Sequence, residues 1–219
     1  MEKQDLISLS PVRIFDAAAK GGLKNGEMGL VTAKKGLGKT SVLVQFGIDF
    51  LLQERHLVHI SFDKHSSNVI AWYDSILAEV AKKKHINISD ISEDILRERT
   101  ILNFSQDTFT LPKVVNTIKA LKEGGINVSA IVIDGLDLER TEKSDLDVMA
   151  SFVKENKIAA WFSFTNEASD LSAQLESAKL DLFSYVAHLS SNGKELAMSL
   201  LKPFEVCVNL DSKTTLMIK

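Results

Sequence analysis

The chain has few of the residues that mark disulfide-stabilised or membrane-spanning proteins. Its single cysteine, Cys207, excludes an internal disulfide framework and a cysteine zinc cluster. Because Cys207 lies among Val206, Val208 and Leu210, we expect a buried and unreactive thiol. No apolar run approaches the roughly 20 residues that span a bilayer, and residues 1–5 lack the apolar core of a signal peptide. These absences favour a cytoplasmic protein without a membrane segment.

Positive charge is also scarce. The 26 Lys and Arg residues are outnumbered by 29 Asp and Glu residues, which gives a formal net charge of −3. This balance argues against a strongly basic surface that binds nucleic acid. The run Lys82, Lys83 and Lys84 fits the solvated last turn of a helix, where cations suit the helix dipole. A nucleic-acid partner is therefore not expected.

Strand-like and helix-like apolar patterns alternate along most of the 219 residues, and a β-rich tail follows. The run 130–134 is apolar up to its last residue, Asp134, which is typical of a parallel strand covered on both faces. We expect one domain over 1–219, with an arm or short edge strand in 1–14 and a β-rich extension of the sheet in 185–219. The expected strands are 28–32, 57–62, 100–105, 130–134, 159–164, 185–189, 195–201, 206–210 and 214–218, and the expected helices are 14–19, 41–52, 69–81, 88–99, 111–122, 144–155 and 171–183.

The segment 33–40, Ala-Lys-Lys-Gly-Leu-Gly-Lys-Thr, lies between an apolar strand and an amphipathic helix. This is the layout of a phosphate-binding P-loop, although Ala33 replaces the usual first glycine. The glycines permit a tight turn whose backbone N–H groups point at an anion. The lysine suits the β- and γ-phosphates, and the threonine hydroxyl suits Mg²⁺. The expected nucleotide-binding residues are Lys35, Gly36, Leu37, Gly38, Lys39, Thr40 and Ser41.

Polar residues end three of the predicted parallel strands, at the edge where the P-loop lies. Asp134 closes the most apolar strand, where P-loop NTPases place the acid that holds Mg²⁺, and Asp137 is a second candidate. Asp63 could orient and deprotonate an attacking water, or it could be an acidic residue that begins the next helix. Thr165 and Asn166 could sense the γ-phosphate, or they could cap a helix. The sequence leaves both alternatives open.

Several of these segments together resemble RecA-like ATPases of the KaiC/DnaB branch. In that family a Gly-Gly-Leu-x-x-Gly-Glu turn leads into the P-loop, as residues 21–27 do here. The segments 60–63, 131–134 and 164–167 resemble the strand that bears the catalytic glutamate, the Walker B strand and the Thr-Ser-Glu ending of the next strand. The similarity covers roughly residues 14–205. It implies an α/β, RecA-like P-loop NTPase fold, with a mostly parallel central sheet flanked by helices and antiparallel β-strands at the C-terminal edge.

Three departures from the family pattern bear on activity. The catalytic glutamate is Asp63 here, one methylene shorter, and misplacing a water by about one ångström can cost on the order of a hundredfold in rate. Lys202 matches a family lysine that reaches the neighbouring subunit's γ-phosphate, but Phe204 stands where an arginine is expected. Arg140 is either a substitute for that arginine or an ordinary surface residue, and the sequence favours the second. Without an arginine finger, turnover is predicted to be slow.

The resemblance implies an ATP-binding protein that uses Mg²⁺ and has weak or residual ATPase activity. It would act as a nucleotide-dependent regulatory or assembly module, in a homo-oligomeric ring or filament, with a protein partner that the sequence does not identify. A non-enzymatic scaffold with a degenerate nucleotide site is the alternative. A DNA-dependent ATPase is the weakest hypothesis, because the loops that would bind DNA are acidic or neutral, with carboxylates at Asp137, Glu139, Glu142, Asp145, Glu167 and Asp170.

Overall fold

The computed structural model describes residues 7–8, 10–62, 65–85, 92–167, 171 and 174–219. Their strands form one nine-stranded sheet in the order β3-β2-β4-β5-β1-β6-β7-β8-β9. From β3 to β6 all neighbours are parallel, and β7, β8 and β9 continue the sheet in antiparallel pairing. The strands are β1 (Met28–Ala33), β2 (His56–Ser61), β3 (Arg99–Asn103), β4 (Val128–Asp134), β5 (Ala159–Thr165), β6 (Tyr185–Ser191), β7 (Leu196–Lys202), β8 (Val206–Leu210) and β9 (Met217–Ile218).

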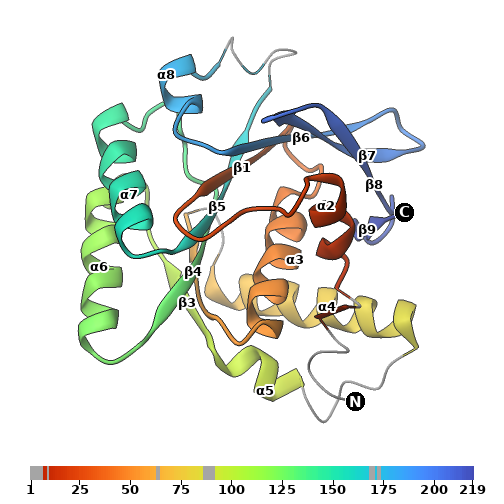
Figure 1. Ribbon diagram of the computed structural model, residues 1–219, viewed down its shortest axis with the longest axis horizontal. Coiled ribbons are helices and arrows are strands. Elements are labelled where there is room, and N and C mark those ends of the chain that lie inside the picture. Colours follow the sequence, from red (N-terminus) through yellow and green to blue (C-terminus); the bar gives the residue numbers. More distant parts are fainter. Residues whose placement is uncertain (1–6, 9, 63–64, 86–91, 168–170, 172–173) are drawn as a thin grey trace.

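Helices cover both faces of the parallel part of the sheet, as Figure 1 shows. On β1, Val31 and Ala33 belong to the core cluster shared with α2, α3 and α4, whereas Met28 and Leu30 belong to the cluster shared with α6 and α7. Alternate side chains therefore enter opposite cores, which explains why the central strands carry apolar side chains on both faces. The helices are α2 (Val12–Ala18), α3 (Lys39–Leu52), α4 (Ser66–Lys84), α5 (Ser92–Arg97), α6 (Leu111–Glu123), α7 (Lys143–Glu155) and α8 (Ser177–Leu180).

This architecture confirms the fold class that the sequence predicts, but four local predictions are wrong. One is the strand 214–218, of which only Met217–Ile218 forms a strand, because 212–214 is a turn. Residues 12–14 belong to helix α2 rather than to an arm or edge strand, because Val12 and Phe15 are buried at helical spacing. In 171–183 the described residues form only the short helix α8. Leu171, Leu175 and Phe183 nevertheless reach one core cluster, so turns satisfy the apolar spacing that suggested a continuous helix.

The fourth wrong prediction is the buried thiol, since Cys207 is exposed. Along β8, Val208 and Leu210 are buried and alternate with exposed Cys207 and Asn209. Only one face of the antiparallel extension meets the core, so buried and exposed side chains alternate along the strand. The apolar residues on both sides of Cys207 hide this alternation in the sequence. Among the described residues, no helix is long and apolar enough to cross a membrane.

The close fit between β1 and β5 gives a stability prediction. A Cβ added at Gly29 would lie 2.5 Å from ring atoms of Trp161, which is itself stacked on Phe46 with ring centroids 4.2 Å apart. We therefore expect Gly29→Ala to lower the free energy of unfolding by about 1–3 kcal/mol, as overpacking does in other cores. Urea denaturation measures this loss. Gly124→Ala is the matched control, since its nearest neighbours are 3.4 Å away and its φ is −74°; equal midpoints for the two variants would contradict the prediction.

Candidate nucleotide-binding site

The predicted P-loop has the backbone conformation that such a loop requires. Gly36 and Gly38 have φ values of +86° and +93°, in the left-handed region that favours glycine. Helix α3 begins at Lys39, immediately after Gly38. The free N–H groups of its first turn therefore lie at the end of the loop, where the positive end of the helix dipole favours an anion.

The Lys39 ammonium lies against the loop itself. Its Nζ donates hydrogen bonds to the carbonyl oxygens of Ala33 at 3.1 Å and of Lys34 at 3.3 Å. Ala33, which replaces the first glycine of the motif, is fully buried as the last residue of β1. The extra methyl group is therefore accommodated beneath the loop, and the lysine is positioned over the concave side expected for phosphates.

Thr40 and Asp134 meet at the carboxyl edge of the sheet, although they are far apart in the sequence. The Thr40 hydroxyl donates a hydrogen bond of 2.7 Å to the Asp134 carboxylate, and the Ser163 hydroxyl donates one of 2.5 Å to its other oxygen. The Gly135 N–H donates in turn to Ser163 Oγ at 2.9 Å, which fixes the start of the loop after β4. The hydroxyl and carboxylate oxygens are hard donors of the kind that Mg²⁺ prefers, so the residues present fit that ion.

Ser163 was not among the predicted site residues. It is a fully buried polar residue in the otherwise apolar strand β5, next to β4 in the sheet. A buried hydroxyl in the middle of such a strand needs a hydrogen-bond partner. The isolated serine in an apolar strand was therefore the feature of the sequence that could have indicated a site residue.

The residues that follow β5 lie against the P-loop. The Asn166 N–H donates to the Ala33 carbonyl at 3.0 Å, and the Asn166 side chain is buried. Thr165 is exposed and lines a cavity of about 340 Å³. The carboxylate of Glu167, which sequence reasoning did not assign to the site, accepts a hydrogen bond from the Lys35 N–H at 3.1 Å. The Glu167 carboxylate thus occupies the backbone N–H of Lys35 in the P-loop.

A model of the KaiC ATPase family matches residues 10–192, which include the P-loop, Asp134 and the segment after β5. The chain belongs to the KaiC ATPase family. The RecA-like resemblance predicted from the sequence is confirmed, and a P-loop that binds ATP is characteristic of this family. A comparison with curated proteins gives no significant match.

In this KaiC-family domain the C-terminal segment packs on the first turns of α3. The hydroxyls of Ser41 and Thr215 are hydrogen-bonded, and Gln45 Nε2 donates to the Thr215 carbonyl at 2.9 Å. Gln45 Oε1 accepts from the Met217 N–H at 3.0 Å. Thr215 has a φ of +59°, which is unfavourable for a β-branched residue. Ser41, a predicted nucleotide-binding residue, is thus engaged with the C-terminal turn.

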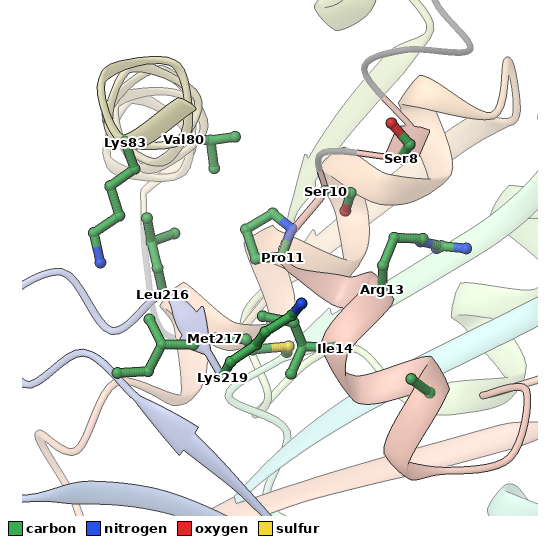
Figure 2. A pocket seen from close by; sticks show the side chains of 12 residues that line it. Ser8, Ser10, Pro11, Arg13, Ile14, Val80, Lys83, Leu216, Met217 and Lys219 are labelled. Carbon is green, nitrogen blue, oxygen red and sulfur yellow. The ribbon is translucent and has the colours of Figure 1, made fainter. Parts of the chain in front are cut away.

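A second cavity, of about 640 Å³, lies behind this C-terminal segment. Figure 2 shows it between Pro11 and Ile14 of the N-terminal part, Val80 and Lys83 of α4, and Leu216. The Lys83 ammonium pairs with the Asp211 carboxylate at 2.7 Å. That hydrogen bond, together with the backbone N–H of Thr214, holds the pKa of Asp211 below its ordinary value. The pair ties α4 to the turn that contacts the P-loop helix.

Next to the loop, the Thr32 hydroxyl of β1 lies 2.9 Å from Nδ1 of His188 in β6. Burial, followed by the charges of Lys34 and Lys39, lowers the pKa of His188. The imidazole is therefore mainly neutral at pH 7, and it adds no cation to the P-loop.

The predicted base and the predicted trans-acting lysine are not seen at the P-loop for different reasons. Asp63 lies outside the described residues. The Lys202 ammonium, predicted to act on a neighbouring subunit, donates to the carbonyls of Leu180 and Asp181 in its own chain, both at 3.3 Å. Phe204 lies under the Lys20 ammonium, 4.5 Å from the ring centroid.

Proposed function

We propose that this KaiC-family chain binds Mg²⁺-ATP and acts as a nucleotide-dependent regulatory or assembly module with slow ATPase activity. The observation that carries the proposal is the Thr40–Asp134 hydrogen bond at the end of a P-loop whose glycines are in the left-handed conformation. That bond joins the two oxygen donors expected for the metal beside the expected phosphate site. A chance Gly-Lys-Thr turn would require neither feature.

Each residue has a distinct proposed role. Residues 35–41 surround the phosphates and donate backbone N–H groups other than that of Lys35, which is bonded to Glu167, and the Lys39 ammonium neutralises the β- and γ-phosphates. Thr40 and Asp134 hold Mg²⁺, which when bound neutralises charge that develops on the phosphates. Asn166 and Thr165 sense the γ-phosphate, and Asp63 accepts a proton from the attacking water.

The proposed slow turnover has two causes. Asp63 is shorter than the glutamate of the family, so it positions the attacking water less well. Phe204 stands where the family has a trans-acting arginine, which leaves Lys202 as the remaining candidate from a neighbouring subunit. We also propose that the chain is a single ATPase domain and forms a homo-oligomeric ring or filament. It would be located in the cytoplasm and bind a protein partner rather than DNA.

Isothermal titration with a non-hydrolysable ATP analogue, with and without Mg²⁺, tests the binding part. We expect saturable binding that Mg²⁺ strengthens, and a wild-type protein that shows none would overturn the proposal. Phosphate release over hours tests hydrolysis. Slow release that Asp63→Asn abolishes, and that single-stranded DNA leaves unchanged, supports an ATPase. A flat trace for both proteins would instead support a nucleotide-binding scaffold.

Glu167 is expected to weaken nucleotide binding by charge repulsion. Its carboxylate accepts a hydrogen bond from the Lys35 N–H, so it lies beside the expected phosphate site. Glu167→Gln keeps the acceptor oxygen and removes the negative charge, which is worth about 1 kcal/mol, or roughly fivefold in affinity. Titration with the ATP analogue should show this gain at low salt and a smaller one at high salt. Glu142→Gln, an exposed acid at the start of α7, is the control; equal affinities of both variants and the wild type would refute the idea.

A further inference from the structure

A polar cavity of about 340 Å³ lies at the carboxyl ends of β4 and β5. Gly135, which lines it, directly follows Asp134, the acid bonded to Thr40. Thr165, on another wall, pairs in register with Ala33 at the start of the P-loop. Thr40 and Asp134 would hold Mg²⁺, which would neutralise charge on the terminal phosphates. A third phosphate would therefore lie on the Asp134 side of the loop, next to this cavity.

Arg140 lines this cavity, and it differs from the other arginines of the chain. Within the described residues, its guanidinium has no hydrogen bond, ion pair or ring contact. The side chains of the remaining four arginines all have partners. These are Asp16 and Asp49 for Arg13, Ser129 and Phe50 for Arg55, Asp94 for Arg97, and the Tyr73 ring for Arg99.

The turn that carries Arg140 is held in place by its own contacts. Asp137 Oδ1 accepts the N–H groups of Glu139 at 3.0 Å and of Arg140 at 3.3 Å. The buried Lys179 ammonium donates to the carbonyls of Leu138 and Glu139, both at 3.2 Å. Asp137 and Glu139 line the same cavity, and the Glu139 carboxylate has a partner of its own, since it accepts a hydrogen bond of 2.8 Å from Gln174. The backbone is thus fixed, and the guanidinium stays available.

We propose that Arg140 supplies, within its own chain, the guanidinium that recognises the third phosphate of a bound nucleoside triphosphate. This inference rests on the proposed nucleotide binding and assigns the residue that distinguishes a triphosphate from a diphosphate. A guanidinium presents a planar fork of donors that matches two phosphate oxygens at once. Such a pair of charge-assisted bonds changes affinity by about tenfold or more. The assignment also gives the site an arginine although Phe204 occupies the expected position of the trans-acting arginine.

Titration calorimetry with Mg²⁺ and either ADP or a non-hydrolysable ATP analogue tests the assignment. We expect Arg140→Ala to weaken binding of the analogue about tenfold or more and to leave ADP binding unchanged, with Arg140→Lys in between. Arg97→Ala is the control, because Arg97 is exposed and its only ion pair is with Asp94 of its own helix, among the described residues. An unchanged ratio of analogue to ADP affinity in Arg140→Ala would overturn the assignment and leave the proposed function standing. A wild-type protein that binds neither nucleotide would overturn both.

A mixture of two variants tests whether Arg140 acts within its own chain. Arg140→Ala chains are co-expressed with Lys39→Ala chains, which still carry Arg140 but are expected to lose their own nucleotide site. If Arg140 acts in its own chain, no tight site for the analogue appears in the mixture. Tight sites in the mixture would show that a neighbouring chain supplies the arginine, and they would overturn the assignment. Thermal unfolding of each variant checks that it is folded.

Discussion

Lys39→Ala is expected to weaken binding of both ADP and the ATP analogue by on the order of a hundredfold or more. The lysine is the cation placed over the concave side of the loop, where its ammonium donates to the carbonyls of Ala33 and Lys34. A hydrogen bond to a charged group contributes about 1.5–3 kcal/mol, and each 1.4 kcal/mol changes affinity tenfold. Loss of two phosphate contacts therefore reaches the stated range. Calorimetric titration of the variant beside the wild type measures it.

The control for this experiment is Lys34→Ala, in the same loop. Lys34 is exposed, and its carbonyl rather than its side chain receives the Lys39 ammonium. We expect a loss of about tenfold at most for this variant, because an exposed charge is screened by solvent. If Lys34→Ala and Lys39→Ala lose affinity equally, the loop attracts phosphates only through its overall charge, and the P-loop assignment of Lys39 is wrong.

Asp134→Asn is expected to abolish the strengthening of nucleotide binding by Mg²⁺. The amide has nearly the same shape as the carboxylate, so its oxygen can still accept from Ser163 and its nitrogen can donate to Thr40. The fold should therefore persist while the negative charge that attracts the metal is lost. Without Mg²⁺, the variant should bind the ATP analogue at least as tightly as the wild type, because a negative charge beside the phosphates is removed. With Mg²⁺, only the wild type should gain affinity, by about tenfold, as expected for a hard cation that requires an anionic ligand.

Asp137→Asn distinguishes a specific ligand from a general acidic environment. Asp137 is the second acid of the same loop, and its carboxylate accepts backbone N–H groups of the turn rather than the Thr40 hydroxyl. We expect this variant to keep the Mg²⁺ dependence of the wild type. A loss of that dependence in Asp137→Asn but not in Asp134→Asn would move the proposed metal ligand to Asp137. Thermal unfolding curves show whether either change disturbs the fold.

Local sequence patterns predicted most of the central elements because burial on both faces leaves a clear signal. The runs 130–134 and 159–164 are apolar except for Asp134 and Ser163, and β4 and β5 cover them almost residue for residue. The signal failed in the segment 171–183 and at Cys207. In 171–183, turns rather than a continuous helix bring the apolar side chains to the core. At Cys207, only one face of the strand is buried.

The sequence by itself determined the P-loop and its family, since Gly36, Gly38, Lys39 and Thr40 are adjacent and their spacing carries the chemistry. Only the tertiary structure decided which distant residues join them. Only the strand order and the turns of the whole sheet bring together three contacts, which are Ser163 on Asp134, Glu167 on the Lys35 N–H and Thr215 on Ser41. No local pattern encodes these contacts. They depend on strand order and register, which long-range burial sets. Arg140 is exposed, as the sequence favoured, and only the structure shows that it lines the cavity at the ends of β4 and β5.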